Sequence, residues 1–154
     1  MHRRRVVVTG IGALTPIGNT KDAFWNGLVS GTSGAAPITH FDASKFKTQF
    51  ACEIKNFDAQ EHFDRKEARK MDRFTQYAMV ASDEAVHDAG LDLEKIDKAK
   101  VGVIWGSGVG GLETFQNEVL NFASGEGTPR FNPFFIPKMI ADIAPGMISI
   151  KYGF

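Results

Sequence analysis

A run of glycines follows a short apolar segment near the middle of the chain. Residues 101–105 (VGVIW) are rich in β-branched side chains, which predicts a short buried strand. Four glycines follow within residues 106–111, and residues 112–122 then place apolar side chains three or four positions apart, as on one face of a helix. A strand that enters a helix through glycines is a common place for ligand binding in α/β proteins.

The glycines at 106–111 (GSGVGG) match the pattern G-x-G-x-x-G, which can seat the pyrophosphate of a dinucleotide at a helix N-terminus. That fingerprint also needs a second strand that ends in an acidic residue about 20 positions further on. Here that distance falls in residues 126–133 (EGTPRFNP), which do not resemble a strand. A nucleotide-binding α/β domain therefore remains only an alternative interpretation.

Residues 64–73 (DRKEARKMDR) form the most charged segment, with five basic and three acidic side chains. If the segment is helical, four basic side chains share one side of it: Lys66, Arg69, Lys70 and Arg73. Two interpretations stay open, a solvated helix face and a docking surface for an acidic partner.

The sequence alone contains no complete catalytic set. Cys52 lies within a predicted strand, residues 48–54, with no glycine turn or helix N-terminus after it to activate a thiol, so we expect a buried structural cysteine. The histidines at 40, 62 and 87 are too scattered for a metal site. We therefore expect no metal and no catalytic residue here.

Composition narrows the class of protein further. The 154 residues carry 18 basic and 18 acidic side chains, which argues against a general nucleic-acid binder. No apolar run approaches the roughly 20 residues that span a bilayer. The basic start of the chain is followed only by Val6, Val7 and Val8, too few for a signal peptide. We expect a cytoplasmic protein that binds neither nucleic acid nor membrane.

Predicted strands and helices alternate along the chain. Residues 5–10 (RVVVTG) read as a strand, and Thr20 is a suitable cap for a helix through residue 28. Residues 71–89 form an amphipathic helix that stops at Gly90, and residues 140–152 form another apolar helix. This order predicts an α/β fold with a mixed, mainly parallel sheet and helices on both faces.

Five segments, taken in order, resemble a β-ketoacyl-acyl-carrier-protein synthase, most of all the elongating synthase II type. They are residues 6–20 (VVVTGIGALTPIGNT), 40–44 (HFDAS), 65–78 (RKEARKMDRFTQYA), 106–111 (GSGVGG) and 132–140 (NPFFIPKMI). The resemblance implies the N-terminal half of a thiolase-like fold and a homodimer. It implies that a cysteine accepts an acyl group from acyl carrier protein and that the malonyl thioester is then decarboxylated and condensed. It further implies that two histidines stabilise the oxyanion and that no cofactor is required.

The chain departs from this family in one respect. It stops at Phe154, before the segment that carries the family's nucleophilic cysteine, and neither Cys52 nor any histidine here matches a catalytic position. We therefore expect residues 1–154 to be the N-terminal part of a ketoacyl synthase, inactive by itself. A non-catalytic partner subunit of the chain-length-factor kind is the alternative.

The resemblance assigns roles to several residues that are present. Gly108 and Val109 match the bottom of the acyl pocket, where Val109 helps to limit chain length. Phe135 matches an aromatic residue that reaches the acyl pocket of the partner subunit. The residues that match the basic contacts to acidic carrier protein are Lys66, Arg69, Lys70 and Arg130.

Overall fold

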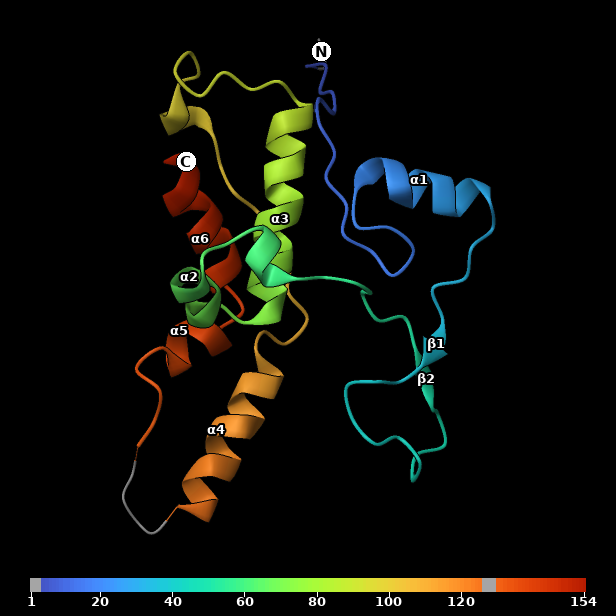
Figure 1. Cartoon of the computed structure of the whole chain (residues 1–154). Helices are drawn as coiled ribbons and strands as arrows, with labels where there is room; N and C mark the ends of the chain where they lie inside the picture. The colour runs from blue at the N-terminus through green and yellow to red at the C-terminus, as the bar shows by residue number, and fades with distance from the viewer. Residues whose placement is uncertain (1–3, 126–129) are drawn as a thin grey trace. The chain divides into compact units, whose positions relative to one another are not determined.

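The computed structural model describes residues 4–125 and 130–154, which form two compact units. The first unit comprises the described part of Met1–Phe57 together with Ala81–Leu91, and the second comprises Asp58–Val80 and Asp92–Phe154. One long helix, α3 (Arg73–Asp88), contributes its beginning to the second unit and its end to the first (Figure 1).

The first unit contains one more helix and a small sheet. Helix α1 (Lys21–Val29) begins where the Thr20 hydroxyl accepts a hydrogen bond from the backbone NH of Ala23, 3.2 Å away. Strands β1 (Ala36–Pro37) and β2 (Phe50–Ala51) pair antiparallel. The predicted cap and helix are therefore confirmed.

The loop before α1 lies directly against the end of α3. A Cβ atom placed on Gly12 would lie 1.8 Å from the Ala81 carbonyl oxygen, and one on Gly10 would lie 2.2 Å from the Ala85 carbonyl oxygen. Only glycine allows the two backbones to come this close. The N-terminal loop is therefore packed through its main chain.

Two carboxylates one turn apart on α3 hold this loop. Glu84 accepts hydrogen bonds from the backbone NH groups of Ala13 (2.8 Å) and Lys21 (2.7 Å). Asp88 accepts from the backbone NH of Ile11 (3.0 Å) and pairs with the Lys21 ammonium. The hydrogen bond from Lys21 lowers the pKa of Asp88 and raises the pKa of Lys21, so each group favours its charged form.

The second unit is built from short helices. In chain order these are η1 (Ala59–Glu61), α2 (Arg65–Lys70), the first half of α3, η2 (Lys98–Lys100), α4 (Leu112–Ser124), α5 (Phe135–Met139) and α6 (Ile143–Tyr152). Its core contains Met71, Ala78, Met79, Ala144 and Ile148. The core therefore joins α3 to α6.

Most of the predicted helices are confirmed, with bounds shifted by a few residues. Residues 71–89 contain α3, and Gly90 after it has a φ of 60°, as expected of a helix stop. Residues 140–152 contain α6, in which Pro145 lies in the first turn and needs no bend. The helix after the glycine run is α4.

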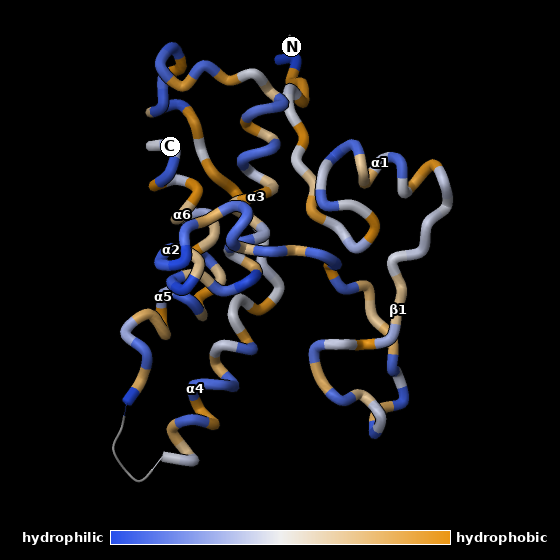
Figure 2. The backbone as a smooth tube through the Cα atoms, viewed as in Figure 1, coloured by the Kyte–Doolittle hydropathy of each residue, from blue (hydrophilic) through white to orange (hydrophobic). Residues whose placement is uncertain are grey.

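The predicted sheet differs from the structure. Within residues 4–125 and 130–154 the sheet has two strands, β1 and β2, and residues 5–10 and 101–105 belong to no ladder. A parallel strand needs neighbours beside it and layers above and below. Val6 is 90% exposed and Ile104 is 98% exposed, whereas Val103 packs against the core of the second unit. Figure 2 shows the hydropathy along the backbone.

Cys52 is exposed, so the expectation of a buried thiol is wrong. It follows β2, whose two residues pair only with β1. A ribbon this short has no second layer to cover its side chains. No helix within the described part of the chain is long and apolar enough to cross a membrane.

Candidate functional site: a glycine turn and a basic helix

The glycine run forms a tight turn that enters α4. Gly110 has a φ of 81°, in the left-handed region, and a Cβ atom on it would lie 2.3 Å from the Met139 carbonyl oxygen. The backbone NH of Gly111 donates to that same oxygen at 2.9 Å. Position 110 therefore requires glycine because of both its conformation and its close neighbour.

The middle of the turn is open. The backbone NH of Gly110 donates to the Ser107 Oγ at 3.1 Å, which closes the turn across Gly108 and Val109. A Cβ atom on Gly108 would have no neighbour within 4 Å, and Val109 is 70% exposed. The turn therefore presents an uncovered valine at the end of a firmly held backbone.

Phe135, the first residue of α5, lies in a row of stacked rings. Its ring centroid is 6.1 Å from that of Phe115 on α4 and 5.7 Å from that of Phe131. Phe131 stacks in turn on Phe122, at 5.2 Å. Three of these rings are about half exposed, so the aromatic row, Phe115, Phe135, Phe131 and Phe122, forms part of the surface of its unit.

The basic side chains of α2 are exposed. Asp64 caps this helix by accepting hydrogen bonds from the backbone NH groups of Lys66 (2.7 Å) and Glu67 (2.9 Å). The exposed set on the helix includes Lys66, Arg69 and Lys70. These three predicted docking residues therefore share one short helix.

Arg73 does not continue this helix, so the expectation that it shares the same face is wrong. Helix α2 ends at Lys70, and Met71 has an extended backbone with φ −111° and ψ 141°. Met71 is only 6% exposed and belongs to the core, so the chain leaves the helix to bury that side chain. Arg73 then begins α3.

A cation–π contact joins the basic helix to the segment that carries Phe135. The Lys70 Nζ lies 5.8 Å from the centroid of the Phe134 ring. Arg130 is exposed a few residues before Phe134 in the same unit. The predicted docking residues and Phe135 thus all belong to the second unit.

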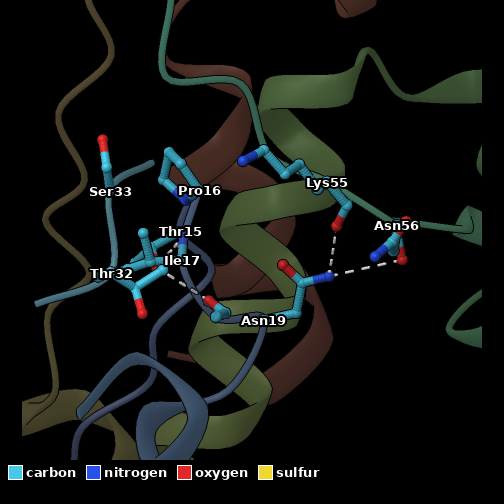
Figure 3. Close-up of a pocket in the computed structure, with 9 residues that line it drawn as sticks. Thr15, Pro16, Ile17, Asn19, Thr32, Ser33, Lys55 and Asn56 are labelled. Atoms are coloured by element: carbon cyan, nitrogen blue, oxygen red, sulfur yellow. Dashed lines mark hydrogen bonds between the residues drawn. The ribbon is translucent and has the colours of Figure 1, made fainter. Parts of the chain in front are cut away.

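A cavity of 330 Å³ lies elsewhere, within the first unit (Figure 3). Its polar lining includes Thr15, Thr32 and Ser33. Asn19 also lines the cavity, and its Nδ2 donates a hydrogen bond to the carbonyl oxygen of Lys55 at 2.8 Å. None of the residues that the sequence predicts as site residues lines this cavity.

The structure also reveals a pair that the sequence pattern did not single out. Thr114, in the first turn of α4, donates a hydrogen bond from its hydroxyl to the Asp72 carboxylate at the start of α3. The two residues are 42 positions apart, so only the fold brings them together. Within the described residues no group of three or more His, Cys, Asp or Glu side chains could hold a metal ion.

Proteins of known function are similar to this chain over nearly all its length. It is 44% identical over 153 residues to 3-oxoacyl-[acyl-carrier-protein] synthase 2 of Synechocystis sp. and 46% identical over 152 residues to the enzyme of the same name in Staphylococcus aureus. Each alignment covers 99% of this chain and 36% of the relative. The chain therefore spans about a third of the length of these relatives.

Solved structures of ketosynthases also match nearly the whole of this chain. A ketosynthase in complex with its type II PKS acyl-carrier protein matches with a TM-score of 0.79 at 28% identity, over 99% of this chain and 40% of that chain. The ishigamide ketosynthase/chain length factor matches with a TM-score of 0.78 at 29% identity, over 98% and 38%. The thiolase-like fold of the N-terminal portion is therefore confirmed.

The family model for the N-terminal domain of β-ketoacyl synthases matches residues 3–154. The G-x-G-x-x-G pattern thus lies inside a ketoacyl synthase match. Residues 126–129, where the dinucleotide fingerprint would need the end of a second strand, lie outside the described residues. The chain belongs to the β-ketoacyl synthase family, and its match lies in the N-terminal domain of that family.

Proposed function

We propose that this chain is the N-terminal part of an elongating β-ketoacyl synthase that condenses acyl groups with malonyl-acyl carrier protein. The observation that carries the proposal is 44–46% identity, over 99% of the chain, to proteins named 3-oxoacyl-[acyl-carrier-protein] synthase 2. The residues that the resemblance assigns to catalysis, a nucleophilic cysteine and two histidines, have no match among residues 1–154, so we expect these residues alone to be inactive.

The reaction proceeds in two stages. A cysteine thiolate attacks the thioester of acyl-carrier protein, and the carrier thiol leaves. Malonyl-carrier protein then loses carbon dioxide, and the resulting carbanion attacks the acyl-cysteine carbonyl, which expels the cysteine thiolate. The developing oxyanion is stabilised by hydrogen-bond donors outside this domain.

This domain contributes binding and length selection. Val109, exposed at the tip of a rigid turn, closes the bottom of the acyl pocket, with Gly108 beside it. By the family resemblance, Phe135 reaches the pocket of a partner subunit in a homodimer; in this structure its ring stacks on Phe115 and Phe131 in the aromatic row. A valine at that depth limits acyl length because a longer chain would overlap it.

Acyl carrier protein docks on α2. Its exposed cations, Lys66, Arg69 and Lys70, are offered by one short helix, and Arg130 adds a fourth. A related ketosynthase structure contains its acyl-carrier protein, which supports this kind of partner.

Charge reversal tests this docking surface. In the full-length synthase, replacing Lys66, Arg69 and Lys70 with Glu is expected to raise KM for acyl-carrier protein about tenfold or more, because attraction to the acidic carrier becomes repulsion. The rise in KM should become smaller as the salt concentration is raised, because salt screens the charges. Lys45→Glu, an exposed lysine of the first unit, is the matched control. An unchanged KM for the triple variant would contradict the proposal that acyl carrier protein docks on α2.

A non-catalytic subunit of the chain-length-factor kind is the second candidate. The match to the ishigamide ketosynthase/chain length factor favours it. The two candidates differ in acyl transfer, because only the enzyme has the nucleophile. Labelled acyl groups that become covalently attached to the full-length protein from acyl-carrier protein identify the enzyme, and their absence identifies the partner subunit.

A further inference from the structure

The Asp72 carboxylate joins the starts of two helices. One oxygen accepts a hydrogen bond from the backbone NH of Phe74 at 3.3 Å, and the Asp72 carbonyl accepts from the NH groups of Thr75 and Gln76, both at 3.1 Å. The second carboxylate oxygen accepts the hydrogen bond from the Thr114 hydroxyl on α4. Asp72 therefore caps α3 and also holds the first turn of α4.

The same carboxylate lies against the glycine turn. A Cβ atom on Gly111 would lie 2.9 Å from the Asp72 Oδ2, the oxygen that Thr114 contacts. Gly111 is fixed in addition by its NH bond to the Met139 carbonyl and by its own carbonyl, which accepts from the NH of Phe115 at 2.9 Å. The end of the turn is thus bonded to α4 and to the end of α5, and the Asp72 carboxylate lies beside it.

The position of Val109 depends on the hydrogen bonds that fix the end of the glycine turn at Gly111. It lies two residues before Gly111 and is exposed, so its position is set by the backbone at the base of the turn. The groove beside the Asp72–Thr114 pair is polar, a cavity of 270 Å³ lined by Arg73, Glu113, Asn117 and Lys138 among others. Met71 also lines this groove, but its other lining residues are polar or charged, so few apolar contacts could replace the hydrogen bond once it is lost.

We propose that Asp72 and Thr114 are positioning residues for the glycine turn, and that their hydrogen bond sets how sharply Val109 limits acyl length. This rests on the proposed function, because the length limit belongs to the condensing enzyme. With the bond present, the turn holds Val109 at one depth. Without it, the turn shifts and the pocket accepts longer acyl groups.

Thr114→Val in the full-length synthase is the variant that isolates this bond. It removes the hydroxyl, keeps the side-chain shape and leaves Asp72 free to cap α3. The expected result is a twofold to tenfold rise in kcat/KM for the longest acyl-carrier substrates relative to medium ones, the range that one hydrogen bond provides. A purely structural loss would instead lower kcat/KM equally for all lengths.

Two controls accompany this variant. Thr114→Ser keeps a hydroxyl at the same position and should retain the wild-type length profile. Thr48→Val removes the hydroxyl of an exposed threonine in the first unit and should leave the profile unchanged. A Thr114→Val profile equal to wild type would overturn the proposal.

Amide hydrogen exchange of the same variants separates this proposal from the proposed function. Faster exchange at Gly111 and Phe115 in Thr114→Val, but not in Thr48→Val, is expected, because both amides lie at the anchored base of the turn. Unchanged exchange would overturn the positioning role. A wild-type enzyme that fails to condense would overturn the proposed function, and exchange would still decide whether the pair holds the turn.

Discussion

Two glycine-rich loops in this chain precede helices, and they use glycine for different reasons. In the first unit, Gly10 and Gly12 have no positive φ but lie so close to α3 that a Cβ atom would overlap its carbonyl oxygens. In the second unit, Gly110 combines a left-handed backbone with a close carbonyl, whereas Gly108 lies in open space. A glycine pattern therefore identifies a turn, but its neighbours decide what the turn does.

The difference extends to the side chains that the loops carry. The first loop is tied down along its length, because Glu84 and Asp88 accept hydrogen bonds from its backbone at Ile11 and Ala13. The second is held at its base by Gly111 and leaves Val109 exposed. The first loop is thus suited to packing, and the second to presenting a residue to a substrate.

The largest expected effect comes from the packing loop. Gly12→Val would place atoms within 2 Å of the Ala81 carbonyl, and we expect a loss of about 3–5 kcal/mol in the free energy of unfolding. Urea unfolding of the full-length protein measures it. Gly108→Ala is the control, for which less than about 1 kcal/mol is expected because its Cβ would meet nothing. Equal losses at both positions would contradict the comparison.

A large side chain at the presenting turn should change specificity rather than stability. Val109→Phe is expected to lower kcat/KM for the longest acyl groups about tenfold to a hundredfold, because the ring fills the bottom of the proposed pocket. Short acyl groups should be condensed nearly as before. The measurement is kcat/KM across a series of acyl-carrier substrates. A length profile that does not change would remove Val109 from the pocket.

The smallest effect concerns pH and the first loop. Because the folded-state pKa of Asp88 is lowered, its contribution to stability is present above about pH 4 and is lost as the pH falls through the folded value. Asp88→Asn should therefore weaken the fall in Tm between pH 5 and pH 3 without abolishing it, since Asp42 and Glu53 also have lowered pKa values. Parallel Tm curves for variant and wild type would show that Asp88 does not contribute.

Local patterns in the sequence predict the helices well. The Thr20 cap predicts where α1 begins, and the apolar spacing after Gly111 predicts α4, because both signals act within one or two turns. Helix α5 is not among the helices that the sequence predicts. Pro137 is the third residue of α5, where a proline lacks no needed hydrogen bond.

Features that depend on distant partners could not be predicted in the same way. Residues 5–10 and 101–105 have strand composition, but a ladder requires neighbours that no local pattern supplies. The Asp72–Thr114 hydrogen bond spans 42 residues, so no local sequence pattern indicates it. Val6 and Ile104 are consequently exposed, and we expect residues 1–154 by themselves to be poorly soluble.

Acyl transfer and condensation test the central claim most directly. Full-length protein that contains this domain is mixed with acyl-carrier protein and malonyl-carrier protein, and the masses of the products are determined by mass spectrometry. We predict a 3-oxoacyl-carrier product two carbons longer than the acyl substrate, together with release of carbon dioxide. Full-length protein that is folded, binds acyl-carrier protein and forms no such product would contradict the claim that this domain belongs to a condensing enzyme.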